Sequence, residues 1–238
     1  LFEENFDYAE GTLLTNSGWT AHSGAGTNPL TVSSPGLSYP AYIPNSGNSV
    51  QLAVSGEDVN HTFDTQTSGS VYASALVNVT SSQTTGEYFL HFGQSTLGTA
   101  FKAKVFIKKA TDTTFSFGVS HGANTADATY STNTYAVGTT YLLVVKYTIV
   151  DGATNDTVHL FINPVISASE PAPSLTAADT GTDLTDVSAF IIRQGNASNS
   201  PVVRIDGIRV TNDWAELWSG EAPKLCPIVG YADTINSH

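Results

Sequence analysis

Hydrophobic and polar residues alternate along several stretches of the chain, as they do in a β-strand with one buried face. In residues 71–80, valine and alanine occupy every odd position. Residues 101–108 alternate in the same way, and lysines at 102, 104 and 108 make their second face largely basic. Residues 114–119 repeat the pattern with phenylalanine and valine. The alternation predicts three strands that each turn one side toward a core.

A fourth stretch, residues 141–150, is apolar nearly throughout. A run of this kind is expected in a central strand that is covered on both sides. The turn sequence Asp151-Gly152 follows it, and residues 157–162 then alternate again. The two stretches predict a hairpin with a slightly long turn.

Residues 202–210 form the last predicted strand. Asp206-Gly207 interrupts its alternation, which predicts a β-bulge at that point. Residues 212–218 carry the only helical signal, one or two turns capped by Asn212.

The spacing of these strands, with no helices between them, predicts an all-β fold. We expect a two-sheet antiparallel β-sandwich of jelly-roll type, with at most one short helix near 212–218. The jelly roll should span residues 1–218, with 164–174 as a long surface loop rich in proline and serine. Residues 219–238 form a C-terminal tail that should pack on the sandwich or on a neighbouring chain.

Several segments of the chain resemble a known family: LFEENFDYAEGTLLTNSGW, GEDVNHTF, GSVYASALVNVTS, GTTYLLVVKYTIVDGATNDTVHLFINP and VVRIDGIRV. Their order along roughly residues 1–214 is similar to that of the concanavalin-like or LamG-like jelly-roll module. This module occurs in secreted, multi-modular proteins of Bacteroidota and related bacteria. The resemblance implies a binding or spacing part that accompanies extracellular enzymes and adhesins, although the fold alone does not define an activity.

Composition and charge narrow the function classes. The chain has 21 acidic and 9 basic residues and a formal net charge of −12, which disfavours nucleic acid as a partner. No stretch approaches the ~20 apolar residues of a membrane span, so we expect no membrane insertion. The single cysteine excludes an internal disulfide. The chain lacks methionine and starts at Leu1. We interpret this as an extracellular or cell-surface protein from which a signal peptide has been removed.

The sequence contains no motif that indicates catalysis. A jelly-roll glycosidase presents paired carboxylates in a run such as E-x-D-x-x-E, and no such run occurs. A polysaccharide lyase of this fold would need a cluster of tyrosine, histidine and a cation on one sheet. The candidates for that cluster are Tyr88, His91, Lys146 and His159. No signature supports them, and Cys226 has no evident histidine partner. We therefore expect a protein that is not an enzyme.

Calcium is the most credible metal. Many sandwich modules that bind sugars join their first and last strands through a cation, and the resemblance places its ligands at Glu4, Asp7 and Asp206. Oxygen donors suit Ca²⁺, whose role would be structural. Alternatively, Asp206 only satisfies backbone groups at the bulge and pairs with Arg204 or Arg209. Both interpretations stay open.

Glycan binding requires exposed aromatic rings on which sugars stack, with polar groups beside them. The candidates in turn-rich stretches are Tyr39, Tyr42, Tyr130 and Tyr135. Trp19 follows a glycine at the end of the first segment, and we expect it to pack in the core instead.

Covalent glycans are a separate possibility. The sequence contains four N-x-S/T sequons, which begin at Asn60, Asn78, Asn155 and Asn196. Bacteroidota instead modify the threonine or serine that follows an aspartate, with a small or aliphatic residue after it. Thr113, Thr157 and Thr234 fit this pattern.

The tail suggests self-association. Its apolar segment could add a strand or a plug to another copy, and the candidate assembly residues are Leu225, Ile228, Val229 and Tyr231. The leading hypothesis is a non-catalytic extracellular structural protein that assembles with copies of itself into a filament, sheath or matrix. The alternative is a carbohydrate-binding or adhesion module of a larger secreted protein, with cell-surface or extracellular glycans as its partners.

Overall fold

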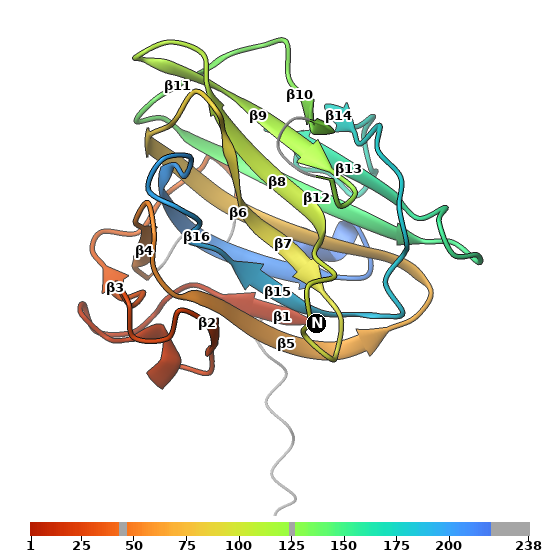
Figure 1. The fold of residues 1–238 in the computed structure, drawn as a ribbon, viewed down its shortest axis with the longest axis horizontal. Coiled ribbons are helices and arrows are strands. Elements are labelled where there is room, and N and C mark those ends of the chain that lie inside the picture. Colours follow the sequence, from red (N-terminus) through yellow and green to blue (C-terminus); the bar gives the residue numbers. More distant parts are fainter. Residues whose placement is uncertain (43–46, 124–126, 220–238) are drawn as a thin grey trace, which may run out of the picture.

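The computed structural model describes residues 1–42, 47–123 and 127–219. They form two antiparallel sheets of eight strands each, stacked face to face (Figure 1). This two-sheet sandwich is the predicted fold class. We call the sheet nearer the viewer in Figure 1 the front sheet and the other the back sheet.

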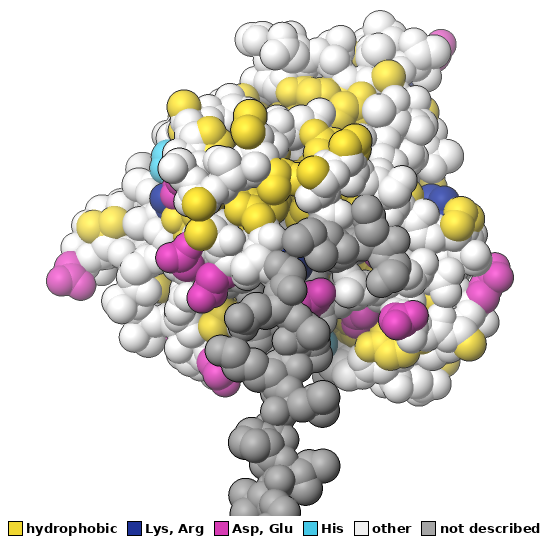
Figure 2. All heavy atoms as spheres, turned by 180° about the vertical axis from the view of Figure 1, so that it is seen from behind, with side chains coloured by type: hydrophobic (Ala, Val, Ile, Leu, Met, Phe, Trp, Pro, Cys, Tyr) yellow, Lys and Arg dark blue, Asp and Glu magenta, His cyan; other side chains and the backbone are white. Residues whose placement is uncertain are grey.

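The back sheet has the order β14-β13-β12-β6-β16-β4-β3, with β1 also paired to β16. Its strands are β1 (Phe2–Glu4), β3 (Val32–Ser33), β4 (Ser49–Leu52), β6 (Gly69–Ser81), β12 (Thr140–Ile149), β13 (Thr157–Ile162), β14 (Leu175–Thr176) and β16 (Val202–Thr211). The outer face of this sheet is seen from behind in Figure 2, where hydrophobic side chains gather between the loops.

The front sheet has the order β10-β9-β8-β7-β15-β5-β2, with β11 also paired to β9. Its strands are β2 (Thr20–Ser23), β5 (Asp58–Gln66), β7 (Glu87–Gly93), β8 (Lys102–Lys109), β9 (Thr114–Ser120), β10 (Thr129–Tyr130), β11 (Tyr135–Ala136) and β15 (Val187–Ile192). Strands β7, β8 and β9 follow one another along the chain, whereas β15 joins them from a distant segment.

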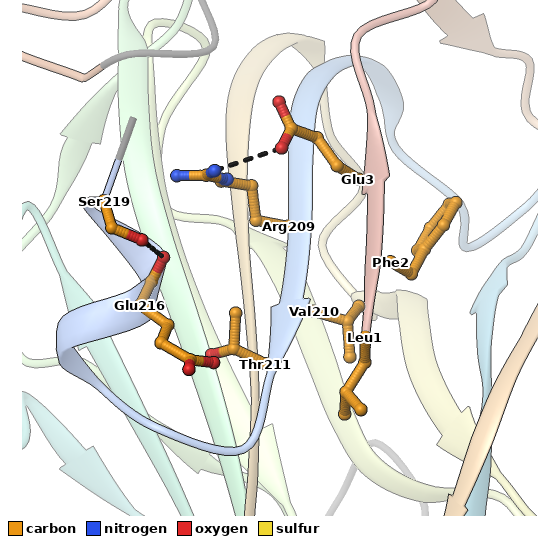
Figure 3. A pocket seen from close by; sticks show the side chains of 8 residues that line it. All are labelled: Leu1, Phe2, Glu3, Arg209, Val210, Thr211, Glu216 and Ser219. Carbon is orange, nitrogen blue, oxygen red and sulfur yellow. Dashed lines mark hydrogen bonds and ion pairs between the residues drawn. The ribbon is translucent and has the colours of Figure 1, made fainter. Parts of the chain in front are cut away.

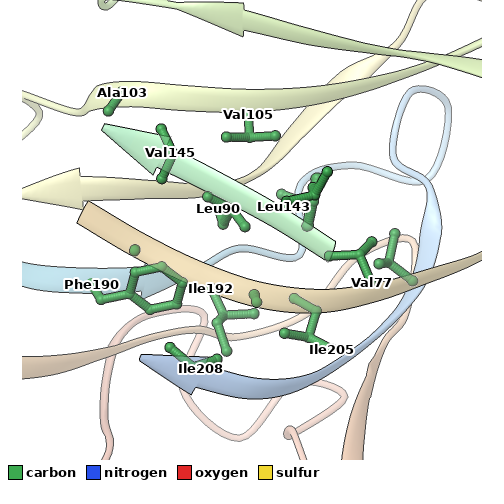
Figure 4. Close-up of a cluster of buried hydrophobic side chains, with 14 of the residues drawn as sticks. Val77, Leu90, Ala103, Val105, Leu143, Val145, Phe190, Ile192, Ile205 and Ile208 are labelled. Carbon is green, nitrogen blue, oxygen red and sulfur yellow. The ribbon is translucent and has the colours of Figure 1, made fainter. Parts of the chain in front are cut away.

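The core lies between the sheets (Figure 4). Val77 and Ile205 of the back sheet and Val105 and Phe190 of the front sheet are fully buried in it. These residues come from alternate positions of their strands, so the period of two in the sequence corresponds directly to the buried face. Burial of apolar surface on this scale, about 25 cal/mol per Å², is the main stabilising contribution to the fold.

The apolar run at 141–150 forms a strand that is covered on both sides, as predicted. Strand β12 places Val144 on the outer face of the back sheet, where it is buried with Tyr72, Phe161 and Trp214. The chain after β16 covers this face, and its helix is only the 3₁₀ turn η3 (Ala215–Leu217). The predicted Asn212 cap is wrong, because the side chain of Asp213 accepts the Ala215 N–H at 2.7 Å.

The bulge in the last strand is confirmed. The pairing of β16 with β6 shifts register between Asp206 and Arg209, and Gly207 adopts a φ of 55°. Glycine adopts this left-handed conformation without steric cost. The extra residue lets Ile205 and Ile208 both point into the core, which explains the break in the alternation.

Candidate functional site

The outer face of the front sheet carries a group of aromatic and basic side chains. On strand β8, Ala103, Val105 and Ile107 belong to the core between the sheets. Lys104 and Phe106 alternate with them and therefore lie on the outer face. The predicted basic face of residues 101–108 is thus the surface that the front sheet turns away from the core.

Three aromatic rings lie in a row across this face. Tyr88 of β7 and Phe106 of β8 have ring centroids 5.6 Å apart, and the centroids of Phe106 and Tyr130 of β10 are 6.2 Å apart. Phe106 is buried, whereas Tyr88 and Tyr130 are partly exposed. The Tyr130 ring lies against Gly118, where an added Cβ would be 2.6 Å from the ring. Because glycine has no side chain, the Tyr130 ring can pack directly against the backbone at position 118.

Three cations contact the exposed rings of this row. The Nζ of Lys104 lies 4.8 Å from the centroid of Tyr88, and the guanidinium carbon of Arg193 lies 4.1 Å from the same centroid. The Nζ of Lys108 lies 5.1 Å from the centroid of Tyr130. These distances fall within the range of cation–π attraction. We call the six residues of the row and its cations the aromatic–basic face: Tyr88, Lys104, Phe106, Lys108, Tyr130 and Arg193.

Lys104 is held in place by backbone groups. Its Nζ donates to the carbonyl oxygens of Gly122 at 2.8 Å and Ala123 at 3.3 Å. The N–H groups of the same turn, His121 to Ala123, donate to the carboxylate of Asp179 at 2.8–2.9 Å. The turn thus lies between an anion and a cation. Lys104 is only 8% exposed as a residue, and burial lowers the pKa of its ammonium.

Arg193 follows β15 and connects the row to one carboxylate. Its Nη1 lies 3.3 Å from Oε1 of Glu87, and it also donates to the backbone carbonyl of Tyr88 at 3.3 Å. The charge of Arg193 is therefore partly neutralised within the protein.

His91 lies beside the row and is 1% exposed. Its Nδ1 is 3.0 Å from the backbone carbonyl of Phe92, which assigns the ring proton to Nδ1. Its Nε2 has no hydrogen-bond partner among the described residues. Burial lowers the pKa of His91 to about 3. The ring centroid lies 5.6 Å from that of Tyr88 and 4.5 Å from that of Phe101. His91 is thus a neutral side chain with one acceptor atom that has no partner among the described residues.

The structure brings together half of the predicted lyase set. Tyr88 and His91 are neighbours on β7, as described above. Lys146 and His159 lie on the back sheet, where they face each other across β12 and β13, and Lys146 forms an ion pair with Glu170 at 2.8 Å. Sequence reasoning missed Lys104 and Arg193 as the cations beside Tyr88. The basic face of residues 101–108 was the available signal for Lys104.

The predicted glycan-binding tyrosines lie in different places. Tyr130 belongs to the aromatic–basic face. Tyr135 packs edge-on against Tyr141, outside the row, and Tyr39 borders the outer face of the back sheet. Tyr42 is 1% exposed and its hydroxyl bonds to Ser74 and to a backbone carbonyl, so its ring offers no platform. Trp19 is buried, as expected.

The predicted calcium ligands do not form a group of three acidic side chains in the described part of the chain. Glu4 is buried and accepts the Phe6 N–H and the Trp19 indole N–H, while Asp7 is exposed. No group of three or more histidine, cysteine or acidic side chains suited to a metal occurs in the described part of the chain. Calcium at these positions stays a prediction without geometric support.

Asp206 accepts backbone hydrogen bonds at the bulge, which agrees with one part of the alternative interpretation. Its carboxylate accepts the N–H groups of Leu37 and Gly207, both at 2.6 Å. Burial raises the pKa of Asp206 to about 7. Neither predicted arginine forms an ion pair with it, because Arg209 pairs with Glu3 and Arg204 bonds to Ser49 Oγ and the Pro35 carbonyl.

The remaining predicted residues are only partly covered by the structure. Thr113 and Thr157 are exposed, which modification would require. Thr234 and the four assembly residues, Leu225, Ile228, Val229 and Tyr231, lie outside the described residues. Self-association through the tail therefore stays a prediction.

A pocket beside β1 is a second candidate (Figure 3). Its described lining contains one lysine or arginine, Arg209, which lies between β1 and η3. Arg209 already binds Glu3 at 3.0 Å and the Leu217 carbonyl at 3.0 Å. Since Arg209 is already bound by groups of the protein itself, the aromatic–basic face is the better candidate for a ligand site.

Comparisons with known proteins define the fold. No protein-family model matches the sequence, and no curated protein matches it. Among solved structures, an alginate lyase in complex with an alginate trisaccharide has 14% identity and a TM-score of 0.52, over 88% of this chain and 96% of the lyase. The globular domain of T. cruzi calreticulin has 10% identity and a TM-score of 0.52, over 91% and 89%. A SAP-like pentraxin from Limulus polyphemus has 11% identity and a TM-score of 0.41, over 79% and 80%.

At these identities the similarity shows a concanavalin-like jelly-roll sandwich and no more. The comparisons nevertheless overturn the prediction that the protein is not an enzyme, because the lyase shares this fold. The missing E-x-D-x-x-E run argues against one glycosidase pattern only. It does not argue against proton transfer by residues such as Tyr88 and His91. As for membranes, no helix in the described ranges has the length and hydrophobicity to cross one.

Proposed function

We propose that the protein binds a glycan on the outer face of the front sheet. The row Tyr88–Phe106–Tyr130 carries this proposal, because its two outer rings are partly exposed and its middle ring is buried beneath them. The C–H faces of sugars stack on such rings, and the neighbouring Lys104, Lys108 and Arg193 supply donors for oxygen atoms.

The resemblance to LamG-like modules of secreted proteins supports the same ligand class. We propose on this basis that the glycan is extracellular and that the chain acts as a module of a secreted protein. The alginate lyase was crystallised with an alginate trisaccharide, so alginate belongs among the glycans to be tested.

The test is a binding measurement on immobilised and soluble glycans with the wild type and two variants. Tyr88→Ala and Tyr130→Ala should each weaken binding at least several-fold. Tyr39→Ala is the matched control, because Tyr39 is also partly exposed but lies at the back sheet. The proposal fails if all four proteins bind equally, or if the wild type binds no glycan of a broad panel.

Cleavage of the bound glycan is a second candidate function. The observation that favours it is the buried Nε2 of His91, which has no hydrogen-bond partner among the described residues and lies beside the Tyr88 ring. A neutral histidine can accept a proton, and a neutral tyrosine can donate one. Mass spectrometry of each glycan after incubation would detect shorter products. Loss of these products in His91→Gln, with binding retained, would support catalysis, whereas intact glycan with the wild type would reject it.

A further inference from the structure

The basic residues of this acidic protein are unevenly distributed. Of the nine lysines and arginines in the chain, four lie on strand β8, and Arg193 follows β15 and contacts Tyr88 of the intervening strand β7. In a chain with net charge −12, β8 therefore carries more lysine and arginine than any other described strand, and a cluster of cations attracts anionic ligands. The back sheet shows little lysine or arginine surface when viewed from behind (Figure 2).

Lys104 is the most informative of these cations. Lys104 is a buried residue, and its ammonium forms no ion pair with any described residue, although the carboxylates of Glu87 and Asp179 lie close enough to favour its charge. Burying a charge without an opposite charge is unfavourable. An ammonium has three donors, and the two carbonyl oxygens of Gly122 and Ala123 use two of them. An anion beside the Tyr88 ring would accept from the third and compensate the charge.

Lys108 repeats the arrangement at the other end of the row. It is exposed, lies over the Tyr130 ring, and also forms no ion pair with a described residue. Lys109, its neighbour on the same strand, differs because it pairs with Asp112 at 2.6 Å. Each partly exposed ring of the row therefore has one cation beside it that forms no ion pair with a described residue.

We propose that the glycan is anionic, with carboxylate or sulfate groups that bind Lys104 and Lys108 while its sugar rings stack on Tyr88 and Tyr130. This inference rests on the proposed function, since it names the class of glycan that the same face would take. Both ammonium groups lie over these tyrosine rings, so an anionic group on a sugar that contacts the rings would be within their reach.

Paired ligands test the charge directly. Calorimetric titration would compare polygalacturonate, polymannuronate and polyglucuronate with their carboxyl-reduced forms, and a sulfated glycan with its desulfated form. The wild type should bind at least one charged member at least ten-fold more tightly than its neutral counterpart, and added salt should weaken that binding. The uronate and sulfate pairs distinguish the two sources of charge.

Substitutions of single lysines show which cations bind the charged ligand. Lys108→Ala should weaken binding of the charged ligand several-fold, and Lys109→Ala, the control on the same strand, should not. Lys104→Met removes the buried charge at similar length, and Lys104→Arg keeps it, so only the first should lose affinity. Thermal unfolding of each variant shows whether the fold is intact.

The outcomes separate the two proposals. Equal binding of charged and neutral partners overturns the anionic ligand but leaves glycan binding in place. No binding to any glycan overturns both. Equal losses in Lys108→Ala and Lys109→Ala would mean a general charge effect and would overturn the assignment to this row.

Discussion

Replacing Gly118 with alanine tests the aromatic row without removing any side chain of the aromatic–basic face. An added Cβ would lie 2.6 Å and 2.7 Å from two ring carbons of Tyr130, and 3.3 Å from the Cβ of Phe106. Carbon atoms in contact prefer about 3.5–4.0 Å, so the Tyr130 ring must move outward by about 1 Å. Gly118 is not among the glycines with positive φ, and the backbone therefore accepts alanine.

The size of the effect follows from these distances. Lys108 Nζ is 5.1 Å from the Tyr130 centroid, and cation–π attraction reaches about 6 Å, so a shift of about 1 Å disturbs this contact together with the position of the ring. Loss of one stacking contact costs about 0.5–1.5 kcal/mol. Since about 1.4 kcal/mol is ten-fold in affinity, Gly118→Ala should weaken glycan binding by about two- to twelve-fold. Stability should change by less than about 1 kcal/mol, because alanine is favoured over glycine in a strand.

The assay is calorimetric binding together with thermal unfolding. Gly98→Ala is the control, since a Cβ there meets nothing within 4 Å. In a Tyr130→Ala background, Gly118→Ala should have no further effect, because the ring it displaces is gone. Wild-type affinity in Gly118→Ala, or an equal loss with and without the Tyr130 ring, would refute the reasoning.

Three further predictions concern stability. Burial raises the pKa of Asp206 from 3.8 to about 7, so its contribution to stability is present below about pH 4 and lost as the pH rises through about 7. Relative to Asp206→Asn, the wild type should lose up to about 4 kcal/mol of unfolding free energy between about pH 4 and about pH 8; a constant difference would contradict this. Tyr147→Phe removes the donor to Asp156 at 2.5 Å and the acceptor for the Leu184 N–H. It should cost about 1–3 kcal/mol by urea denaturation, and an unchanged midpoint would show that these bonds do not stabilise the fold. Phe117→Ala opens a cavity in the core and should cost about 3–5 kcal/mol in the same assay; a loss below about 1 kcal/mol would mean that the site collapses.

Two controls apply to the last two predictions. Tyr39→Phe removes a hydroxyl from a partly exposed ring, and Val165→Ala shortens a side chain that is 73% exposed. Both should change stability by less than about 0.5 kcal/mol.

The sequence alone predicted six of the strands, β6, β8, β9, β12, β13 and β16, and in the alternating ones it also predicted which side faces inward. In residues 71–80, 101–108 and 202–210 the period of two is a local property of extended backbone, so it predicted the buried faces before any pairing was known. The Asp206-Gly207 bulge was equally predictable, because it interrupts that period where a glycine can adopt positive φ. The basic outer face of 101–108 was visible for the same reason.

Only the tertiary structure decided what lies beside that basic face. Tyr88, Lys104, Tyr130 and Arg193 come from four separate segments, and Arg193 contacts the Tyr88 carbonyl across 105 positions of the chain. Strand pairing depends on burying whole faces of two sheets at once, and no local pattern encodes which strands become neighbours. The same limit explains why Lys146 and His159 were grouped with Tyr88 and His91, although they lie on the other sheet. Function was least predictable, because it depends on side chains that become neighbours only after the sheets have formed.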